Sequence, residues 1–312
     1  MAKEHKHSYK DRPLASKSVL GVTRPNFLLL TPICVSIGVA TAALSGHTIN
    51  WSTLAVVLLG AVMAHISANA LNEYADFHSG LDFKTTRTPF SGGSGTLVGI
   101  PEMAPQALLI GIVSSTITLI SGLYLVWQSG TGLIPLGLLG LIIIFAYSGP
   151  INRNRYLVLI APGLGFGPLM VVGTHYALTG EYSESAVLAS LIPFFLVNNL
   201  LFLNQVPDKE PDQNVGRDNF VIALKTKDAA MIYGGFAFAA YFGVVIGTAL
   251  DTLPLTAMIC LLTAPFTFQV FSAFRKHQGT VEPLLPALGM NVAISLSTPL
   301  LLTVGIGLNL VV

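Results

Sequence analysis

Two long stretches of this chain contain no Asp, Glu, Lys or Arg residue: one lies between Arg24 and Glu73, and the other lies between Glu102 and Arg153. Each stretch has room for two membrane-crossing helices, because one crossing takes about 20 predominantly apolar residues. Polar residues at 45–47 and 128–130 interrupt the stretches and predict a hairpin turn in each. A chain with this charge pattern is expected to fold within a lipid bilayer.

Five further charge-free intervals each accommodate about one crossing. Together with two helices from each long stretch, they predict nine transmembrane helices. The composition agrees, since 52% of the 312 residues are hydrophobic and only 10% are charged. The predicted fold class is all-α, a polytopic membrane bundle of nine transmembrane helices. The five intervals are 156–180, 185–207, 229–250, 252–274 and 283–312.

The 16 Lys and Arg residues predict the orientation of the bundle. If the amino terminus is cytoplasmic, all of them fall on the cytoplasmic side and the opposite loops have none, as the positive-inside rule requires. We therefore expect a multi-pass protein of the cell's inner (cytoplasmic) membrane. Residues 1–24 would form a basic cytoplasmic tail, and residues 25–312 would form one nine-helix transmembrane domain.

Charge and cysteine content exclude several functions. The net charge of +1, with basic residues scattered over several loops, argues against nucleic-acid binding. The two cysteines, Cys34 and Cys260, fall inside predicted spans and form neither a disulfide framework nor a zinc pattern. Polar residues within spans, such as His65, His175 and Asn199, are expected to form hydrogen bonds between helices. No obligate protein partner is inferred.

An acidic motif occurs twice, each time where a long apolar segment meets a charged loop. Asn72 and Asp76 close the second predicted span, and Asn204 and Asp208 close the sixth, so a weak internal repeat relates the two halves of the chain. Residues four apart lie on one helix face, which lets each pair present an amide oxygen and a carboxylate together. Both motifs border predicted cytoplasmic loops. We therefore predict a cytoplasmic active-site cavity between two pseudo-repeated halves.

Asp82 and Asp212 extend the two motifs. Gly80 is expected to end the helix near residues 78–80, so that the following loop folds Asp82 back toward the site. Pro207 is expected to end or kink the sixth span. Mg²⁺ takes one or two carboxylates together with phosphate oxygens and water, which suits these oxygen-bearing side chains. The predicted Mg²⁺ ligands are Asn72, Asp76, Asp82, Asn204, Asp208 and Asp212.

Basic residues lie in the same loops as the acids. Guanidinium groups match the oxygens of a diphosphate in two-point contacts, so these residues are candidates for binding a charged substrate head. Some of them can equally serve only as topology markers. The predicted substrate-binding residues are Lys84, Arg87, Arg153, Arg155 and Arg217.

The two acidic segments resemble the UbiA superfamily of membrane aromatic prenyltransferases. The segment 72–82 is similar to the first aspartate motif of that family, and the segment 204–212, followed by residues 216–217, is similar to the second. The resemblance extends from Arg24 through the ninth predicted span. It implies nine helices with both motifs on the cytoplasmic side.

A narrower resemblance points to one branch of the family. The segments 88–95, 146–156 and 165–168 are similar to the dihydroxynaphthoate prenyltransferases, which make menaquinone. This implies Mg²⁺-dependent transfer of a polyprenyl group from its diphosphate to an aromatic acceptor, with pyrophosphate released. Dihydroxynaphthoate, in quinone biosynthesis, is the acceptor that this resemblance favours.

Four residues are expected to act directly in that reaction. Asp76 and Asp208 would bind the cation at the diphosphate, and the ring face of Tyr147 would shield an allylic cation. Glu73 adjoins the metal-binding face and would either take the proton from the acceptor or support a neighbouring base.

The acceptor stays open on the sequence alone. Glu73 stands where the family commonly has Asp, and Pro207 stands where an Arg commonly precedes the second motif's first Asp. Hydroxybenzoate, homogentisate, a lipid or a sugar are alternative acceptors. In a different class, the chain would be a cation-coupled membrane transporter, although such a protein should hold its acids near the bilayer midplane.

Overall fold

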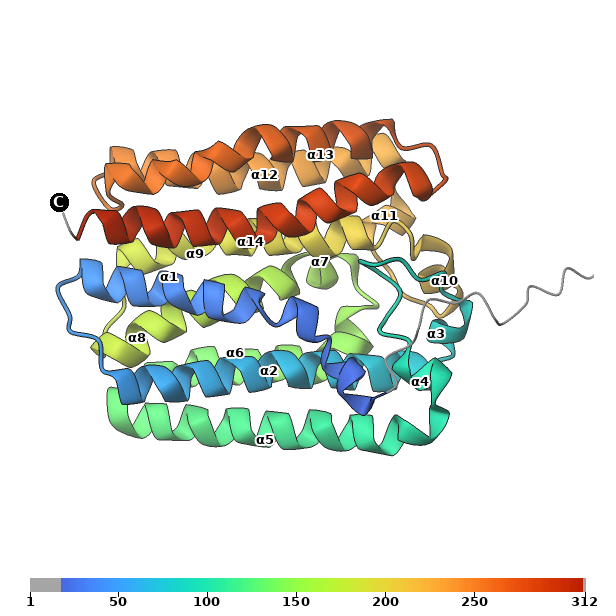
Figure 1. Cartoon of the computed structure of the whole chain (residues 1–312), viewed down its shortest axis with the longest axis horizontal. Helices are drawn as coiled ribbons and strands as arrows, with labels where there is room; N and C mark the ends of the chain where they lie inside the picture. Colours follow the sequence, from blue (N-terminus) through green and yellow to red (C-terminus); the bar gives the residue numbers. More distant parts are fainter. Residues whose placement is uncertain (1–17, 311–312) are drawn as a thin grey trace, which may run out of the picture.

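The computed structural model describes residues 18–310, and this part of the chain consists of helices joined by turns and loops, without strands. Figure 1 shows the long helices side by side along the longest axis, with several short helices gathered at one end. Those short helices are α3 (Leu81–Lys84), α4 (Thr96–Gly99), α10 (Lys209–Asn214) and α11 (Phe220–Ala223). Both acidic motifs lie there, and we call it the acidic end of the bundle.

Eight helical segments within residues 18–310 are long and apolar enough to cross a membrane. Val19–Phe27 and Leu30–Leu44 meet at a bend of 46° and pass the same test together. The predicted all-α membrane bundle is confirmed, and the predicted number of nine crossings is reached when this bent pair counts as one crossing. The eight segments are Trp51–His78, Pro101–Ser129, Leu133–Ile151, Arg155–Thr179, Glu184–Asn204, Thr226–Ala249, Leu255–Lys276 and Glu282–Leu308.

Within these crossings, the helices have the following bounds, with α for α-helices and η for 3₁₀- or π-helical segments: η2 (Val19–Thr23), η3 (Pro25–Phe27), α1 (Leu30–Leu44), α2 (Trp51–His78), η4 (Pro101–Met103), α5 (Ala104–Ser129), α6 (Leu133–Ala146), η5 (Tyr147–Ile151), α7 (Arg155–Leu164), η6 (Gly165–Val172), α8 (Gly173–Thr179), α9 (Glu184–Asn204), α12 (Thr226–Ala249), η7 (Leu255–Thr263), α13 (Ala264–Lys276), η8 (Glu282–Leu284) and α14 (Leu285–Leu308).

Both predicted hairpins are present, although the second turn begins two residues later than predicted. The first occupies residues 45–50 and ends on Asn50, whose side-chain oxygen accepts hydrogen bonds from the N–H groups of Ser52 and Thr53 at 3.0 and 3.1 Å. This cap satisfies two of the free N–H groups at the start of α2. The second turn occupies residues 130–132, between α5 and α6.

The predicted tail ends earlier than residue 24. Residues 1–17 lie outside the described part of the chain, but Val19–Thr23 forms η2 and packs on the bundle. Val22 is fully buried, in a cluster with Ala70 of α2 and Leu97 of α4. The sequence analysis assigned residues 19–23 to the tail because the first 24 residues are polar and basic as a whole. In the structure, the apolar side chain of Val22 belongs to the folded domain.

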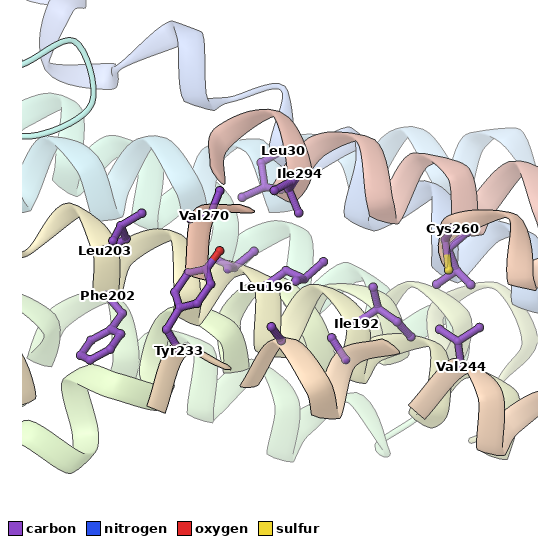
Figure 2. Close-up of a cluster of buried hydrophobic side chains, with 14 of the residues drawn as sticks. Leu30, Ile192, Leu196, Phe202, Leu203, Tyr233, Val244, Cys260, Val270 and Ile294 are labelled. Carbon is purple, nitrogen blue, oxygen red and sulfur yellow. The ribbon is translucent and has the colours of Figure 1, made fainter. Parts of the chain in front are cut away.

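Helix α9 lies at the centre of the bundle. In its most apolar stretch, 67% of the residues are buried inside the protein. Figure 2 shows Ile192, Leu196 and Leu203 of α9 among buried side chains of the surrounding helices, including Tyr233 of α12 and Ile294 of α14. Because lipid tails are as apolar as these side chains, their contribution comes from close packing rather than from the exclusion of water.

Polar side chains tie the same helices together. Asn199 of α9 donates from Nδ2 to the carbonyl of Tyr233 at 2.9 Å, and Asn291 of α14 donates to the carbonyl of Asn199 at 3.1 Å. His65 pairs with Thr31 at 2.9 Å and His175 with Thr41 at 3.0 Å. The predicted hydrogen bonds between helices are thus confirmed, and each removes an unpaired polar group from the apolar interior.

Two glycines bring the broken crossing of α7, η6 and α8 very close to α9. A methyl group at Gly163 would collide with the carbonyl of Phe194, and one at Gly167 would meet the carbonyl of Ser190. Small residues four apart allow such close helix contact in membranes. This contact fixes one wall of the cavity described next.

Candidate active site

One cavity of about 520 Å³ extends from the acidic end into the bundle. Its walls near that end contain all six predicted Mg²⁺ ligands, together with Tyr147 and Arg217. The two motifs are far apart in sequence but meet because α2 and α9 both terminate at this end. The residues that line the cavity from the two motifs are Asn72, Asp76, Asp82, Asn204, Asp208 and Asp212.

The first motif combines the last turns of α2 with the short helix α3. Asn72 donates from Nδ2 to Asp76 Oδ2 at 2.9 Å, and its own oxygen accepts from the Ser148 hydroxyl at 3.1 Å. The helix ends at His78, and Gly80 adopts a left-handed φ of 75°, as a tight reversal requires. Asp82 is then turned back and buried at the cavity wall, as predicted from the sequence.

The second motif is divided by a helix break, which the sequence predicted at Pro207. α9 ends at Asn204, the chain turns through residues 205–208, and α10 begins at Lys209. Asn204, Asp208 and Asp212 therefore come from three successive elements, and all three line the cavity.

Arg217 connects the two motifs. Its Nη1 donates to Asp212 Oδ1 at 3.0 Å, and its Nη2 forms an ion pair with Asp76 Oδ1. Only 19% of the Arg217 side chain is exposed, so both pairs lie in a low-dielectric environment. The guanidinium thus occupies the space between the carboxylates of the first and second motifs.

Three oxygen atoms at the site suit a bound cation. Asp82 Oδ2, Asn204 Oδ1 and Asp208 Oδ1 are buried and have no hydrogen-bond partner. A buried acceptor without a donor is costly, and a cation would satisfy it. Among residues 18–310, no group of three or more His, Cys, Asp or Glu side chains is close enough to hold a metal ion by itself. A cation here would need amide, water or phosphate oxygens as further ligands, which is how Mg²⁺ binds.

Burial changes the protonation of the acids outside the spans. Desolvation raises the pKa of Asp82 to about 7, and the neighbouring carboxylates of Glu73 and Asp76 add to the rise. Desolvation also raises the pKa of Asp208 to about 7, with a further contribution from Asp212. Burial raises the pKa of Asp212 as well, although the Arg217 guanidinium opposes this. Asp82 and Asp208 are therefore partly protonated near neutral pH unless a cation replaces the protons.

Of the five predicted substrate-binding bases, only Arg217 lines the cavity. Arg155 forms an ion pair with Asp218 at 2.9 Å instead. Lys84, Arg87 and Arg153 also lie outside the cavity lining. The sequence could place these residues in the right loops, but it could not tell which of them turn toward the site.

Arg24 is a cavity-lining cation that sequence reasoning missed. It lies between η2 and η3 with a left-handed φ of 50°, which is uncommon for a residue with a side chain. Its Nε and Nη2 donate to Glu73 Oε2 at 3.3 and 3.1 Å. The available signal was its position as the last charged residue before a long charge-free stretch, directly preceding Pro25.

Of the two roles expected for Glu73, its environment suits support of a neighbouring basic residue, here Arg24, better than proton transfer. Its side chain is fully buried, it lies outside the cavity lining, and its carboxylate accepts hydrogen bonds from Arg24 and from the backbone N–H of Ser94. Sequence reasoning considered proton transfer because of its place beside Asn72. On a helix, adjacent residues point in directions about 100° apart, so neighbours in sequence do not share a face.

The deeper part of the cavity is apolar. It continues between α2, α5, α6 and η6 as far as Val57, Leu125 and Leu133, which are buried. Several residues of α5 and α6 that line this cavity also have large exposed fractions: Leu119 at 45%, Leu123 at 61%, Ile134 at 43% and Leu138 at 57%. Exposure of this size at the cavity wall indicates an opening between α5 and α6 toward the surface that faces lipid in a membrane; we call this opening the α5–α6 slit.

A bundle of membrane-crossing helices, with a polar cavity at one end that continues into an apolar one, defines a multi-pass membrane protein. The model of the UbiA prenyltransferase family matches residues 30–293, which is most of the chain. The chain belongs to this family and is a membrane prenyltransferase.

Individual relatives are distant. The 1,4-dihydroxy-2-naphthoate octaprenyltransferase of Bacillus subtilis (strain 168) is 25% identical over 261 residues, an alignment that covers 82% of each chain. The apo structure of a UbiA homolog from Aeropyrum pernix K1 superimposes with a TM-score of 0.70 at 19% identity, covering 91% of this chain and 98% of that one. A UbiA homolog from Archaeoglobus fulgidus bound to GPP and Mg²⁺ gives a TM-score of 0.64 at 15% identity, covering 92% and 99%. These structures establish the shared fold.

Proposed function

We propose that this membrane prenyltransferase transfers a polyprenyl group from its diphosphate to an aromatic acceptor, with dihydroxynaphthoate in menaquinone biosynthesis as the favoured acceptor. The observation that carries the proposal is one cavity with two contrasting ends: carboxylates and guanidinium groups at the acidic end, and an apolar interior between α2, α5 and α6. A molecule with a charged head and a long apolar tail complements both.

Mg²⁺ would be held by the oxygens of the two motifs, from Asn72, Asp76, Asp82, Asn204, Asp208 and Asp212. When bound, Mg²⁺ would neutralise charge on the diphosphate oxygens. The unpartnered oxygens of Asp82, Asn204 and Asp208 support this assignment, because they need a positive partner. The Archaeoglobus homolog with GPP and Mg²⁺ supports it by analogy.

Two guanidinium groups would bind the leaving group. Arg217 and Arg24 both line the cavity, and each is oriented by a carboxylate ion pair. In the proposed reaction, the bond between the first prenyl carbon and the diphosphate oxygen breaks, and diphosphate leaves with the bonding electrons. Cations fixed in place before the reaction stabilise this developing charge without needing to reorganise.

The allylic carbon would then be attacked by the acceptor ring, which forms a carbon–carbon bond and loses its displaced substituent as a proton or as carbon dioxide. Tyr147 lines the cavity at the junction of α6 and η5, where its ring can shield a positive carbon. The prenyl tail would occupy the apolar part of the cavity, which excludes water from the carbocation.

The acceptor assignment is supported by the 25% identity to the dihydroxynaphthoate octaprenyltransferase of Bacillus subtilis. We propose further that the acidic end is cytoplasmic and that the protein resides in the cell's inner membrane. The charge distribution supports this orientation, because Lys and Arg residues lie in the loops at the acidic end.

The decisive experiment measures pyrophosphate release by the purified protein in detergent with geranylgeranyl diphosphate, with Mg²⁺ present or chelated. Parallel reactions contain dihydroxynaphthoate, hydroxybenzoate or no acceptor, and mass spectrometry identifies the product and any loss of a carboxyl group. Mg²⁺-dependent release with dihydroxynaphthoate is expected. Release only with another acceptor would reject dihydroxynaphthoate, and no release with any acceptor or donor length would favour a cation-coupled transporter.

Two variants test the metal site within that assay. Asp76→Ala and Asp208→Ala should each abolish turnover while the protein remains folded, because each removes a carboxylate from one of the two motifs. Asp251→Asn is the matched control, since Asp251 lies in the turn after α12, away from the cavity lining. Full activity in both Ala variants would reject the proposed metal site.

A further inference from the structure

The glycine-rich loop at residues 91–95 forms part of the cavity wall at the acidic end. Ser91, Gly92 and Gly93 line the cavity beside the acidic motifs. Gly92, Gly93 and Gly95 have φ values of 83°, 72° and 75°, in the left-handed region that favours glycine. Glycine has no side chain that favours one backbone conformation over others. Contacts with other parts of the protein must therefore hold this loop in a single conformation.

Glu73 provides those contacts. The N–H of Ser94 donates to Glu73 Oε1 at 2.6 Å and to Oε2 at 3.2 Å. Gly93 lies so close that a Cβ placed there would be 3.0 Å from both Glu73 Oε1 and Asp82 Oδ1. The loop therefore rests directly on the Glu73 carboxylate, next to one of the metal-binding candidates.

The same carboxylate also fixes the amino-terminal segment. Arg24 donates to Glu73 Oε2 from Nε and Nη2. Both carboxylate oxygens are thus used, one mainly by the loop and the other by Arg24. Because the side chain is fully buried, no water competes for these bonds, and charge-assisted hydrogen bonds are about twice as strong as neutral ones.

We propose that Glu73 is a positioning residue: it fastens the loop 91–95 and Arg24 over the acidic end, and so shapes the part of the cavity that binds the donor's diphosphate. This inference rests on the proposed function for the identity of the donor. It assigns Glu73 no proton transfer, since both carboxylate oxygens accept hydrogen bonds and the residue lies outside the cavity lining.

Glu73→Gln separates this role from that of a base. The amide keeps the size of the side chain but replaces one acceptor oxygen with an N–H donor, which would face Ser94 or Arg24. A loosened loop should raise the KM for prenyl diphosphate roughly tenfold, with kcat falling less than about threefold. Loss of a base would instead lower kcat severely and leave KM nearly unchanged.

A second readout needs no turnover. Lys84 and Arg87 precede the loop, so limited trypsin digestion of the metal-free protein reports on the order of this region. Glu73→Gln should increase the rate of cleavage after Arg87 several-fold. Cleavage at an unchanged rate, together with lost kcat, would overturn the positioning role.

Gly93→Ala provides an independent variant in which Glu73 is intact. Its Cβ would push against both the Glu73 and the Asp82 carboxylates, so it should reproduce the raised KM and the faster cleavage, and the digestion of the metal-free protein isolates the effect on the loop. Gly46→Ala is the matched control: Gly46 has a similar φ of 82°, but a Cβ there meets no atom within 4 Å. If Gly93→Ala behaves like Gly46→Ala, the proposal fails.

Failure of the proposed function gives a different result. If the wild-type protein releases no pyrophosphate with any donor, the proposed function fails, whereas the digestion still tests the contact between Glu73 and the loop.

Discussion

Arg217 and Asp76 form an ion pair across the cavity, joining the second acidic segment to the first. The same guanidinium holds Asp212 at 3.0 Å, so one side chain neutralises a carboxylate from each motif. In the proposed reaction, the diphosphate and its cations must enter this space. Arg217 would then exchange carboxylate partners for phosphate oxygens, while the carboxylates gain cations.

Arg217→Lys tests that exchange. Lys keeps the positive charge but lacks the planar fork that contacts two groups at once. We expect kcat to fall roughly a hundredfold, the scale seen when one fixed donor to a developing anion is lost. Steady-state kinetics of pyrophosphate release would measure it. Arg155→Lys serves as the control, because Arg155 is also paired with an Asp but lies outside the cavity lining, and equal losses in the two variants would contradict the assignment.

The metal requirement should depend on pH. Burial raises the pKa of Asp82 and of Asp208 to about 7, so both groups are partly protonated in neutral solution. A cation binds the ionised form and displaces the protons. The Mg²⁺ concentration needed for half-maximal activity should therefore rise as the pH falls from 8 to 6, by about tenfold over that whole interval for each of these groups that loses its proton to the cation. A requirement independent of pH would contradict these raised pKa values.

The stability of the metal-free protein should fall as the pH rises. Both pKa values lie above the value of about 4 expected for an unfolded Asp. The folded state therefore retains protons that the unfolded state has released, and the stability contributed by these groups is lost as the pH rises from about 4 to about 7. Thermal unfolding of chelator-treated protein at pH 5.5 and 8, with and without added Mg²⁺, would measure this loss and its recovery.

Donor length can be tested at two glycines. Gly122 of α5 and Gly137 of α6 line the apolar part of the cavity, and a Cβ at either position meets no atom within 4 Å. A side chain can therefore start at either position without a clash, and Gly122→Phe or Gly137→Phe would place an aromatic ring in the part of the cavity proposed for the tail. We expect the ratio of kcat/KM for a long donor to that for geranyl diphosphate to fall by at least about tenfold, or about 1.4 kcal/mol.

The control for this prediction is Gly235→Phe on α12. Gly235 also has open space around it but lies outside the cavity lining. A ratio of kcat/KM values that stays at the wild-type value in all three variants would show that the tail does not occupy the slit.

The sequence predicted the helical crossings well because the cost of placing charges in lipid restricts where they can stand. The positions of Asp76, Asp82 and Asp208 also followed from local rules, since helix ends, glycine and proline decide them. By contrast, the burial of Glu73 depends on Arg24 and Ser94, which are distant in the chain. Periodicity contains no information about such contacts, and this is why the cavity-lining role of Arg24 was missed.

The α5–α6 slit has a consequence for how the reaction would end. The two proposed products differ sharply in solubility: pyrophosphate is hydrophilic, whereas a prenylated ring is more lipophilic than its precursor. The acidic end would release the first into water, and the slit would release the second sideways into the membrane. We expect this separation into two phases to prevent the products from meeting again, so that forward turnover is favoured without any moving gate.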